Sequence, residues 1–289
     1  AGLFDGALVT RMNPESPLEP LPILATTKLE IQQATGSKYC PVAANLRFRD
    51  ILDTDGRFAV VGLPCHIHGL RMAQARMPKL RSKVVVSIAL FCGLNMKPAA
   101  TRFALNRRKI PTDQIVELRY RGEGWPGYLQ VRLKDGQLYR EHLFSYFDAQ
   151  FSAYEMHRCA LCSDAFGELA DISCGDAWLP EYRAKDVRGT SVVIVRDTRG
   201  AGLLATVGHS LDLTPLDAGT AAASQENALL WKKDWLLAKS NLARFFGRET
   251  PTYVQALPAA RWQHYAGSGW QAASRFLHRQ LHRLWGYHQ

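Results

Sequence analysis

The stretch "RFAVVGLPCHIHGLRMAQARM" (57–77), followed by "VVVSIALFCGL" (84–94), decides the fold. Apolar, β-branched residues predict a strand over residues 58–63, helical spacing predicts a helix over 66–76, and a second apolar strand covers 84–91. Strand, helix and strand with short connections form a βαβ unit, in which the two strands are parallel and the crossover is right-handed. The core is therefore expected to be of the α/β type.

Two cysteines follow the predicted strands of this unit. Cys65 comes directly after the first strand and Cys92 directly after the second. In open α/β sheets the carboxyl ends of parallel strands share one edge, and ligands collect beyond that edge. We therefore expect both thiols on the same rim of the sheet.

The rest of the chain extends this core in two ways. Residues 115–144 contain three strand-like runs, 116–121, 128–133 and 138–143, with an Asp-Gly turn at 135–136, which predicts an antiparallel meander. Another strand is expected at 191–196, and from residue 227 the pattern becomes helical. The expected fold class is α/β (mixed α+β), with a parallel βαβ sheet core, an antiparallel meander and a C-terminal helical segment.

Composition and charge limit the classes of function. No apolar run approaches the roughly 20 residues of a membrane span, so no transmembrane segment and a cytoplasmic location are expected. The net charge is +10, and residues 231–289 hold nine Lys/Arg but two Asp/Glu, a net +7. Such a segment suits an anionic partner or is a solvated helix face. The chain has no RNA-binding signature, so nucleic acid is not an expected partner.

The cysteines are too sparse for a disulfide scaffold, and "HRCALCSDAFGELADISCGDAW" (157–178) contains a C-x-x-C pair. A zinc ribbon needs a second pair, and a thioredoxin-type dithiol needs the pair at a helix start after a strand, so both fit poorly but stay open. Four thiolates form the usual shell of an iron–sulfur cube. Cys159 and Cys162 supply two, and Cys65 and Cys92 on the rim can supply the others. We interpret Cys40 and Cys174 as packing residues, and we expect Asp164, Asp171 and Asp176 to fix the loop by accepting backbone N–H bonds.

Five blocks together carry a family resemblance: "GSKYCPV" (36–42), "VVGLPCHIHGLR" (60–71), "ALFCGLN" (89–95), "YRGEGWPG" (120–127) and "RCALCSDAFGELADISCGDAW" (158–178). In this order they resemble the beta subunit of coenzyme F420 hydrogenase/dehydrogenase, a family that includes reductases of chlorophyll precursors. The resemblance implies a partial N-terminal family domain over 1–80 and a C-terminal family domain with the C-x-x-C loop over 81–215. A basic amphipathic helical tail, 216–289, lies outside it, with Trp270, Ala273, Leu277, Leu281 and Leu284 along one face. Full-length members begin with a cysteine-rich segment and a flavin-contacting helix, so we expect an N-terminal part to precede residue 1.

The resemblance implies an oxidoreductase that carries FAD and a 4Fe-4S cluster, with the cluster on Cys65, Cys92, Cys159 and Cys162. Such an enzyme passes electrons between an iron–sulfur donor, either ferredoxin or a redox partner subunit, and a small-molecule two-electron acceptor such as coenzyme F420 or a tetrapyrrole. Two alternatives remain: a zinc-stabilised binding module with a basic tail, and an accessory electron-transfer subunit without its own substrate. Association of the chain into a homo-oligomer is a further open alternative.

Candidate flavin and catalytic residues follow from the same blocks. The loop Thr35, Gly36, Ser37, Lys38 and Tyr39 offers backbone N–H groups and a cation to a pyrophosphate, and it resembles the flavin-side motif of the family. Gly62 and Pro64 allow a ring or phosphate to approach the strand end, Arg119 and Arg121 suit an anionic ligand, and Trp125 offers a stacking wall. His66 and His68 are the catalytic candidates, as hydrogen-bond donors to the cluster or as proton relays. Solvated turns and exposed side chains are the structural alternatives for all of these groups.

Overall fold

The computed structural model describes residues 2–183, 185–254 and 256–284 and confirms the βαβ unit at the centre of the chain. Strand β3 (Phe58–Gly62) leads into helix α3 (Pro64–Arg76), and after helix α4 (Pro78–Lys83) strand β4 (Val84–Leu90) returns parallel to β3. Pro64 occupies the first turn of α3, where a residue without an N–H group loses no hydrogen bond.

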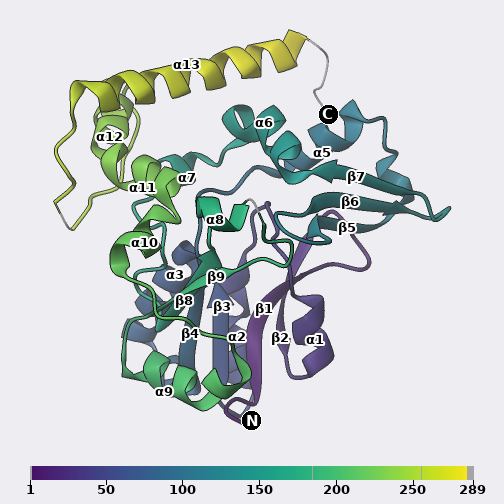
Figure 1. Ribbon diagram of the computed structural model, residues 1–289, viewed down its shortest axis with the longest axis vertical. Coiled ribbons are helices and arrows are strands. Elements are labelled where there is room, and N and C mark those ends of the chain that lie inside the picture. The colour runs from purple at the N-terminus through teal and green to yellow at the C-terminus, as the bar shows by residue number, and fades with distance from the viewer. Residues whose placement is uncertain (1, 184, 255, 285–289) are drawn as a thin grey trace.

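One six-stranded sheet contains this unit, in the order β2-β1-β3-β4-β8-β9. The other four strands are β1 (Gly6–Met12), β2 (Pro20–Ala25), β8 (Ile172–Asp176) and β9 (Ser191–Val195). β1, β3, β4 and β8 are parallel, and the two edge strands are antiparallel to their neighbours. In Figure 1 the parallel strands rise from the N-terminal end, so their carboxyl ends point toward the meander and toward α7 and α11 above.

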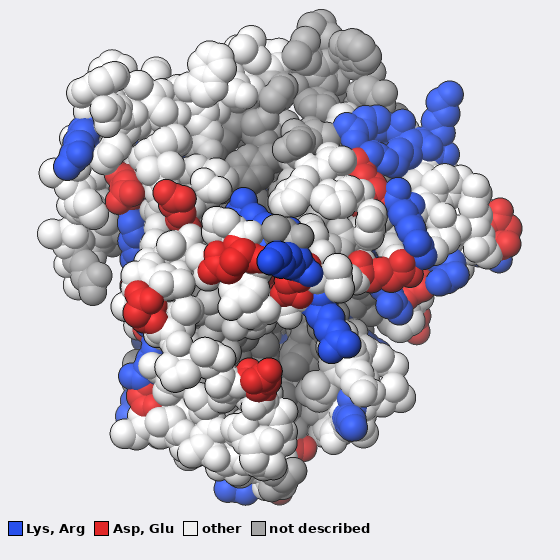
Figure 2. Space-filling view, viewed as in Figure 1, with Lys and Arg blue, Asp and Glu red and all other residues white. Residues whose placement is uncertain are grey.

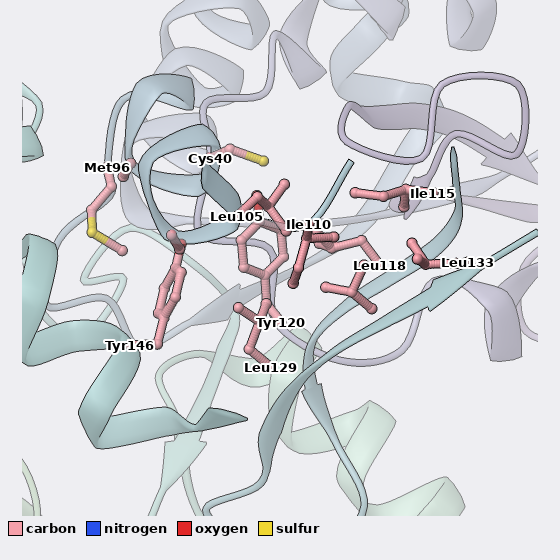
Figure 3. Packing of buried hydrophobic residues seen from close by; sticks show 13 residues of the cluster. Cys40, Met96, Leu105, Ile110, Ile115, Leu118, Tyr120, Leu129, Leu133 and Tyr146 are labelled. Atoms are coloured by element: carbon pink, nitrogen blue, oxygen red, sulfur yellow. The ribbon is translucent and has the colours of Figure 1, made fainter. Parts of the chain in front are cut away.

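The predicted meander is confirmed as a separate three-stranded sheet of β5 (Ile115–Gly122), β6 (Tyr128–Leu133) and β7 (Leu138–His142). One of its faces packs against α5 (Pro98–Arg107) and α6 (Leu143–Tyr154). Tyr120 from β5 and Tyr146 from α6 lie fully buried in this core (Figure 3), and the Tyr120 hydroxyl hydrogen-bonds to Thr101 at 2.8 Å. Cys40 belongs to the same apolar cluster, in agreement with its interpretation as a packing residue.

The remaining helices surround the two sheets. They are α1 (Lys28–Gln33), α2 (Phe48–Asp53), α7 (His157–Ala160), α8 (Pro180–Arg183), α9 (Thr198–Val207), α10 (Ala218–Ala223), α11 (Glu226–Leu229), α12 (Leu236–Phe245) and α13 (Trp262–Leu284). A π-helical turn (Leu230–Asp234) joins α11 to α12, and 3-10 turns occur at Ala44–Arg47, Thr112–Gln114 and Gly208–Ser210. None of the helices described is long and apolar enough to cross a bilayer.

The C-terminal tail is helical, as predicted, and α13 runs along the outer edge of the molecule in Figure 1. Trp270, Ala273 and Leu277 of its predicted apolar face are exposed to solvent. The other two residues of that face, Leu281 and Leu284, lie outside the described side chains. The mixed α/β fold class is confirmed, whereas the division at residues 80 and 215 stays a prediction.

Candidate functional site

The parallel register of β3 and β4 sets Cys65 beside Cys92. Gly62 at the end of β3 pairs with Ala89 of β4, and each cysteine lies three residues beyond its member of this pair. Cys65 sits in the first turn of α3, and Cys92 in the loop after β4. Both residues therefore lie at the carboxyl edge of the sheet, as the sequence predicts.

Backbone hydrogen bonds fasten the C-x-x-C loop to the segment that carries Cys92. The Cys92 N–H donates to the Ala165 carbonyl at 2.9 Å, three residues after Cys162. The Asn95 N–H donates to the Cys159 Sγ at 3.3 Å. Cys159 lies on the one-turn helix α7, and the chain turns immediately after it so that the Cys162 N–H donates to the Cys159 carbonyl at 3.2 Å. Both thiols of the pair are thus held at the sheet rim.

The pKa values of the thiols reflect this convergence. Burial raises the pKa of Cys92 to about 12, although the Lys232 ammonium opposes the rise. The other three thiols of the predicted set raise the pKa of Cys92 further, because each of them lies within electrostatic range of Cys92. Desolvation and then the Cys162 thiol also raise the pKa of Cys65, although Cys65 is exposed as a residue. The structure therefore brings together the four cysteines that the sequence singled out.

A buried lysine completes this cluster. Lys232, in the π-helical turn, is only 3% exposed. Its ammonium donates to the Cys162 Sγ at 3.4 Å and to the Asp164 carbonyl at 2.8 Å. Burial alone would lower the pKa of Lys232, yet the thiols of Cys92 and Cys162 raise it above the ordinary value. The sequence "WKKD" carries no signal for this position, because it has the composition of a solvated helix face.

The donor set fits an iron–sulfur cube in its chemistry. Cysteine thiolates are the usual ligands of such clusters, and a nearby cation compensates the negative charge that they bring. A cube binds each thiolate through a separate iron, so its ligands stand farther apart than those of one ion. Within the three described ranges, no three His, Cys, Asp or Glu side chains form a ligand group for a single metal ion.

Three aspartates in the loop have distinct roles. Asp164 accepts from the backbone N–H groups of Phe166, Gly167 and Glu168 at 2.7–3.0 Å, which confirms the predicted fixing of the loop. Asp176 differs, because it pairs with Arg121 at 2.6 Å.

Asp171 is 1% exposed and links the segments that carry the cysteines. Its carboxylate accepts from the Ser87 N–H at 2.6 Å and hydroxyl at 2.8 Å, both on β4, and from the Arg71 guanidinium at 2.8 Å, on α3. Arg199 adds a further contact at 3.1 Å. Because α3 carries Cys65 and β4 leads to Cys92, this network sets how the three segments meet.

The predicted flavin residues gather beside the same rim, around Arg121. Its guanidinium donates to Asp176, and to the Pro126 carbonyl at 2.7 Å, and it lies 5.8 Å from the centre of the Trp178 ring. The ring centres of Trp125 and Trp178 are 4.7 Å apart. Burial raises the pKa of Tyr39. The Arg121 cation and a hydrogen bond between the Ser37 and Tyr39 side chains oppose that rise.

The loop of residues 35–39 also approaches Arg121 through its backbone. Gly36 has a φ of +80°, a conformation that favours glycine, and a β-carbon there would lie 3.5 Å from the Arg121 carbonyl. The structure therefore brings Gly36, Ser37, Tyr39, Arg121 and Trp125 together.

Trp125 has an unmet hydrogen bond. Its indole Nε1–H is buried, and no residue in the described parts of the chain accepts from it. Buried donors in native proteins nearly always have partners, so an acceptor supplied by a ligand would complete this one. A flavin carries ring carbonyls and nitrogens of that kind, so the residues present fit the group.

Two cationic residues of the predicted flavin set, Lys38 and Arg119, have partners within the protein. The Lys38 ammonium donates to the carbonyls of Ala34, Thr35 and Gly36 at 2.6–3.0 Å, and burial lowers the pKa of Lys38 to about 8. Arg119 is largely exposed and pairs with Glu117 at 2.6 Å. A phosphate contact by either residue stays a prediction.

The histidines and the residues around them lie at the start of α3. The Leu63 N–H donates to His66 Nδ1 at 3.2 Å, which leaves His66 Nε2 to donate to the Val42 carbonyl at 3.1 Å. Burial also lowers the pKa of His66, which favours the neutral ring. His68 is exposed. Gly62 is needed for this arrangement, since a β-carbon there would lie 2.9 Å from the His66 Cβ. The catalytic role of both histidines stays a prediction.

Two family models match this arrangement. The model for the C-terminal part of the coenzyme F420 hydrogenase/dehydrogenase beta subunit matches residues 55–218, more than half of the chain, and the model for the N-terminal part matches residues 1–48. The chain belongs to this family. The resemblance inferred from the five sequence blocks is thereby confirmed.

Several curated relatives belong to the same group. The beta chain of coenzyme F420 hydrogenase from Methanothermobacter thermautotrophicus is 26% identical over 210 residues, 70% of this chain and 68% of its own length. One of the subunits of the F(420)H(2) dehydrogenase of Methanosarcina mazei is 27% identical over 168 residues, 56% of this chain and 44% of its own length. The chloroplastic 7-hydroxymethyl chlorophyll a reductase of Oryza sativa subsp. japonica is 24% identical and covers 74% of this chain and 45% of its own length. The chain thus spans less than half of two of these relatives.

A solved structure, of the F420-reducing [NiFe] hydrogenase complex from Methanosarcina barkeri, contains a chain with the same fold as this family member. The TM-score is 0.64 at 19% identity, over 86% of this chain and 84% of the other. Residues 219–289 lie beyond the matched family models, and Lys232 is among them.

Proposed function

We propose that this chain is an FAD- and 4Fe-4S-dependent oxidoreductase. It would pass electrons between an iron–sulfur donor, either ferredoxin or a partner subunit, and a two-electron acceptor such as coenzyme F420 or a tetrapyrrole-like substrate. The observation that carries the proposal is the convergence of four thiols from three segments on one sheet edge, beside the buried Lys232. The names of the relatives support the same reaction class.

Cys65, Cys92, Cys159 and Cys162 would hold the cluster, and the groups around Arg121 and Trp125 would hold the flavin. When bound, the cluster exchanges single electrons and the flavin exchanges one or two, which joins a one-electron donor to a two-electron acceptor. The chain's own residues position these groups: Asn95 and Asp164 fix the C-x-x-C loop, and Asp176 orients Arg121.

Anaerobic reconstitution tests the proposal. The protein incubated with iron, sulfide and FAD should bind about four irons per chain, the content of one cube. A sample that binds zinc but takes up no iron with acid-labile sulfide would contradict the proposal and favour the zinc-stabilised module. A loaded protein that reduces neither coenzyme F420 nor a tetrapyrrole, but accepts electrons from ferredoxin, would be the accessory subunit.

Replacement of Trp125 by phenylalanine should weaken FAD binding. The ring is kept while the unpartnered indole N–H is removed, and one hydrogen bond of about 1 kcal/mol corresponds to roughly a fivefold rise in Kd. Quenching of flavin fluorescence on titration of the apoprotein measures this constant. Trp262→Phe, an exposed change on α13, is the matched control and should leave Kd unchanged. Equal Kd values for Trp125→Phe and wild type would remove Trp125 from the flavin site.

The corner formed by α12 and α13 is our candidate docking surface for the electron donor. Phe245 and Phe246 at the end of α12 are 82% and 70% exposed, and Trp262 on α13 is 75% exposed. Figure 2 shows this region, at the upper left, as mostly uncharged surface. The exposed Arg244 and Arg248 flank the two phenylalanines. Exposed aromatic groups next to arginines are typical of protein interfaces, and the net +7 of residues 231–289 favours an acidic partner over a second copy of this basic chain.

The double reversal Arg244→Glu with Arg248→Glu should raise the Kd for an acidic ferredoxin about tenfold, because favourable charge pairs become repulsive. Salt should weaken the binding of ferredoxin to the wild type, because it screens the charges, and it should weaken the binding to the variant much less. Isothermal titration calorimetry at low and high ionic strength measures both effects. The reversal of two other exposed arginines, Arg49 on α2 and Arg57 directly before β3, makes the same change in net charge and serves as control. Equal weakening by both pairs would place the docking surface elsewhere.

A further inference from the structure

Lys232 is the feature of this site that lies outside the matched family models. Those models end at residue 218, whereas the ammonium of Lys232 lies among the thiols at the sheet rim. Three neighbours in the tail hold the same loop: Gln225 donates to the Asp176 carbonyl at 2.6 Å, Lys233 pairs with Glu168, and Tyr253 donates to the Leu161 carbonyl at 2.6 Å. The tail is therefore part of the site.

The charge of Lys232 lacks an ordinary counterion. The charge of a lysine that is only 3% exposed is costly unless an anion or several acceptors compensate it. Among the described residues no carboxylate lies within salt-bridge distance of Lys232, and its hydrogen bonds go to the Cys162 sulfur and the Asp164 carbonyl. The missing negative charge must therefore come from the thiol side of the site.

The local backbone supports a dedicated role. Lys232 lies in a π-helical turn between α11 and α12, a conformation that is rare and is frequently found at functional sites. Adjacent lysines of this turn have different surroundings: Lys232 is buried against Cys162, whereas Lys233 stays half-exposed beside Glu168. One lysine is thus aimed at the thiols and the next at the surface.

We propose that Lys232 is a positioning residue that holds the C-x-x-C loop and supplies a fixed positive charge to the group bound by the four thiols, so that it favours the reduced form of that group. This inference rests on the proposed function, because it assigns the bound group to a 4Fe-4S cluster. A cube with four thiolate ligands is an anion, and one-electron reduction makes it more negative. A fixed cation in a water-poor site stabilises the more negative state more strongly.

Potentiometric titration of the reconstituted holoprotein tests this role, with the visible absorbance and the electron paramagnetic resonance signal of the cluster as readouts. Lys232→Gln should lower the ratio of reduced to oxidised cluster at a fixed potential by at least about tenfold, which corresponds to about 59 mV for one electron. Lys232→Arg keeps the charge and should restore most of the ratio. Lys233→Gln, the adjacent half-exposed lysine, should leave it unchanged.

Each outcome decides the inference. A Lys232→Gln protein that carries a cluster with the wild-type potential would overturn it. If Lys232→Gln fails to retain a cluster, the variants Lys232→Arg and Lys232→Met decide. Retention of the cluster by Lys232→Arg together with its loss in Lys232→Met supports the charge-compensating role. Loss of the cluster in the Gln, Arg and Met variants alike overturns that role in favour of a purely steric one. A wild-type protein that never binds a cluster would instead contradict the proposed function, so the two failures are distinguishable.

Discussion

Replacement of Cys159 by serine should reduce cluster content at least about tenfold, because a neutral hydroxyl is a poor substitute for a thiolate ligand of iron. The Cys159 sulfur accepts from the Asn95 N–H, so serine fits the space while the ligand is lost. Iron and acid-labile sulfide per chain, together with the visible absorbance after anaerobic reconstitution, measure the effect. The same loss is expected for Cys65, Cys92 and Cys162.

Cys174 provides the matched control for these variants. It lies within β8, and the nearby charge that raises its pKa, after burial, is Asp176 rather than another thiol. Cys174→Ser should therefore retain the full iron content. A cluster that survives Cys159→Ser but disappears in Cys174→Ser would show that the four-thiol assignment is wrong.

Replacement of Asp171 by alanine should have the largest effect on stability. The change leaves the Ser87 N–H and the Arg71 guanidinium without their buried acceptor, a loss of about 3–5 kcal/mol. For a chain of this size that loss lowers Tm by roughly 10 °C. Circular dichroism during heating and urea unfolding measure the change in Tm and in the free energy of unfolding.

Arg199 serves as the comparison for Asp171. Its side chain is 49% exposed and makes only the outer contact to the same carboxylate, so Arg199→Gln should cost less than about 1 kcal/mol. Equal destabilisation by the two variants would mean that the buried bonds to β4 and α3 contribute little.

The parts of the fold that the sequence predicts are those made from neighbouring residues. β3, α3 and β4 follow one another with short connections, and the three meander strands are separated by turns with clear signals. β8 escapes such analysis because only one of its five residues, Ile172, is strongly apolar, and its parallel partner β4 lies about 80 residues earlier. β2 escapes it because two of its six residues are prolines, which occur in sheets mainly on edge strands.

The candidate site likewise contains residues whose position the sequence predicts and residues whose position it does not predict. Cys65 and Cys92 can be placed at one rim because strand ends determine where the following residue lies. Lys232 cannot be placed, since its partners Cys162 and Asp164 are about 70 residues away and the π turn that aims it has no pattern in the sequence. Trp178 is missed for a related reason: its contacts with Trp125 and Arg121 depend on the approach of two sheets.

The order of strands in the large sheet also bears on how fragments of this chain would behave. β1 hydrogen-bonds to β3 along one side and to β2 along the other, so the segment matched by the N-terminal family model supplies the neighbour that β3 needs. A fragment that starts at residue 55 would leave the backbone of β3, an almost wholly apolar strand, open to solvent on one side. An exposed edge strand of this kind can pair with a strand of another chain, so such a fragment is expected to self-associate rather than fold as a monomer.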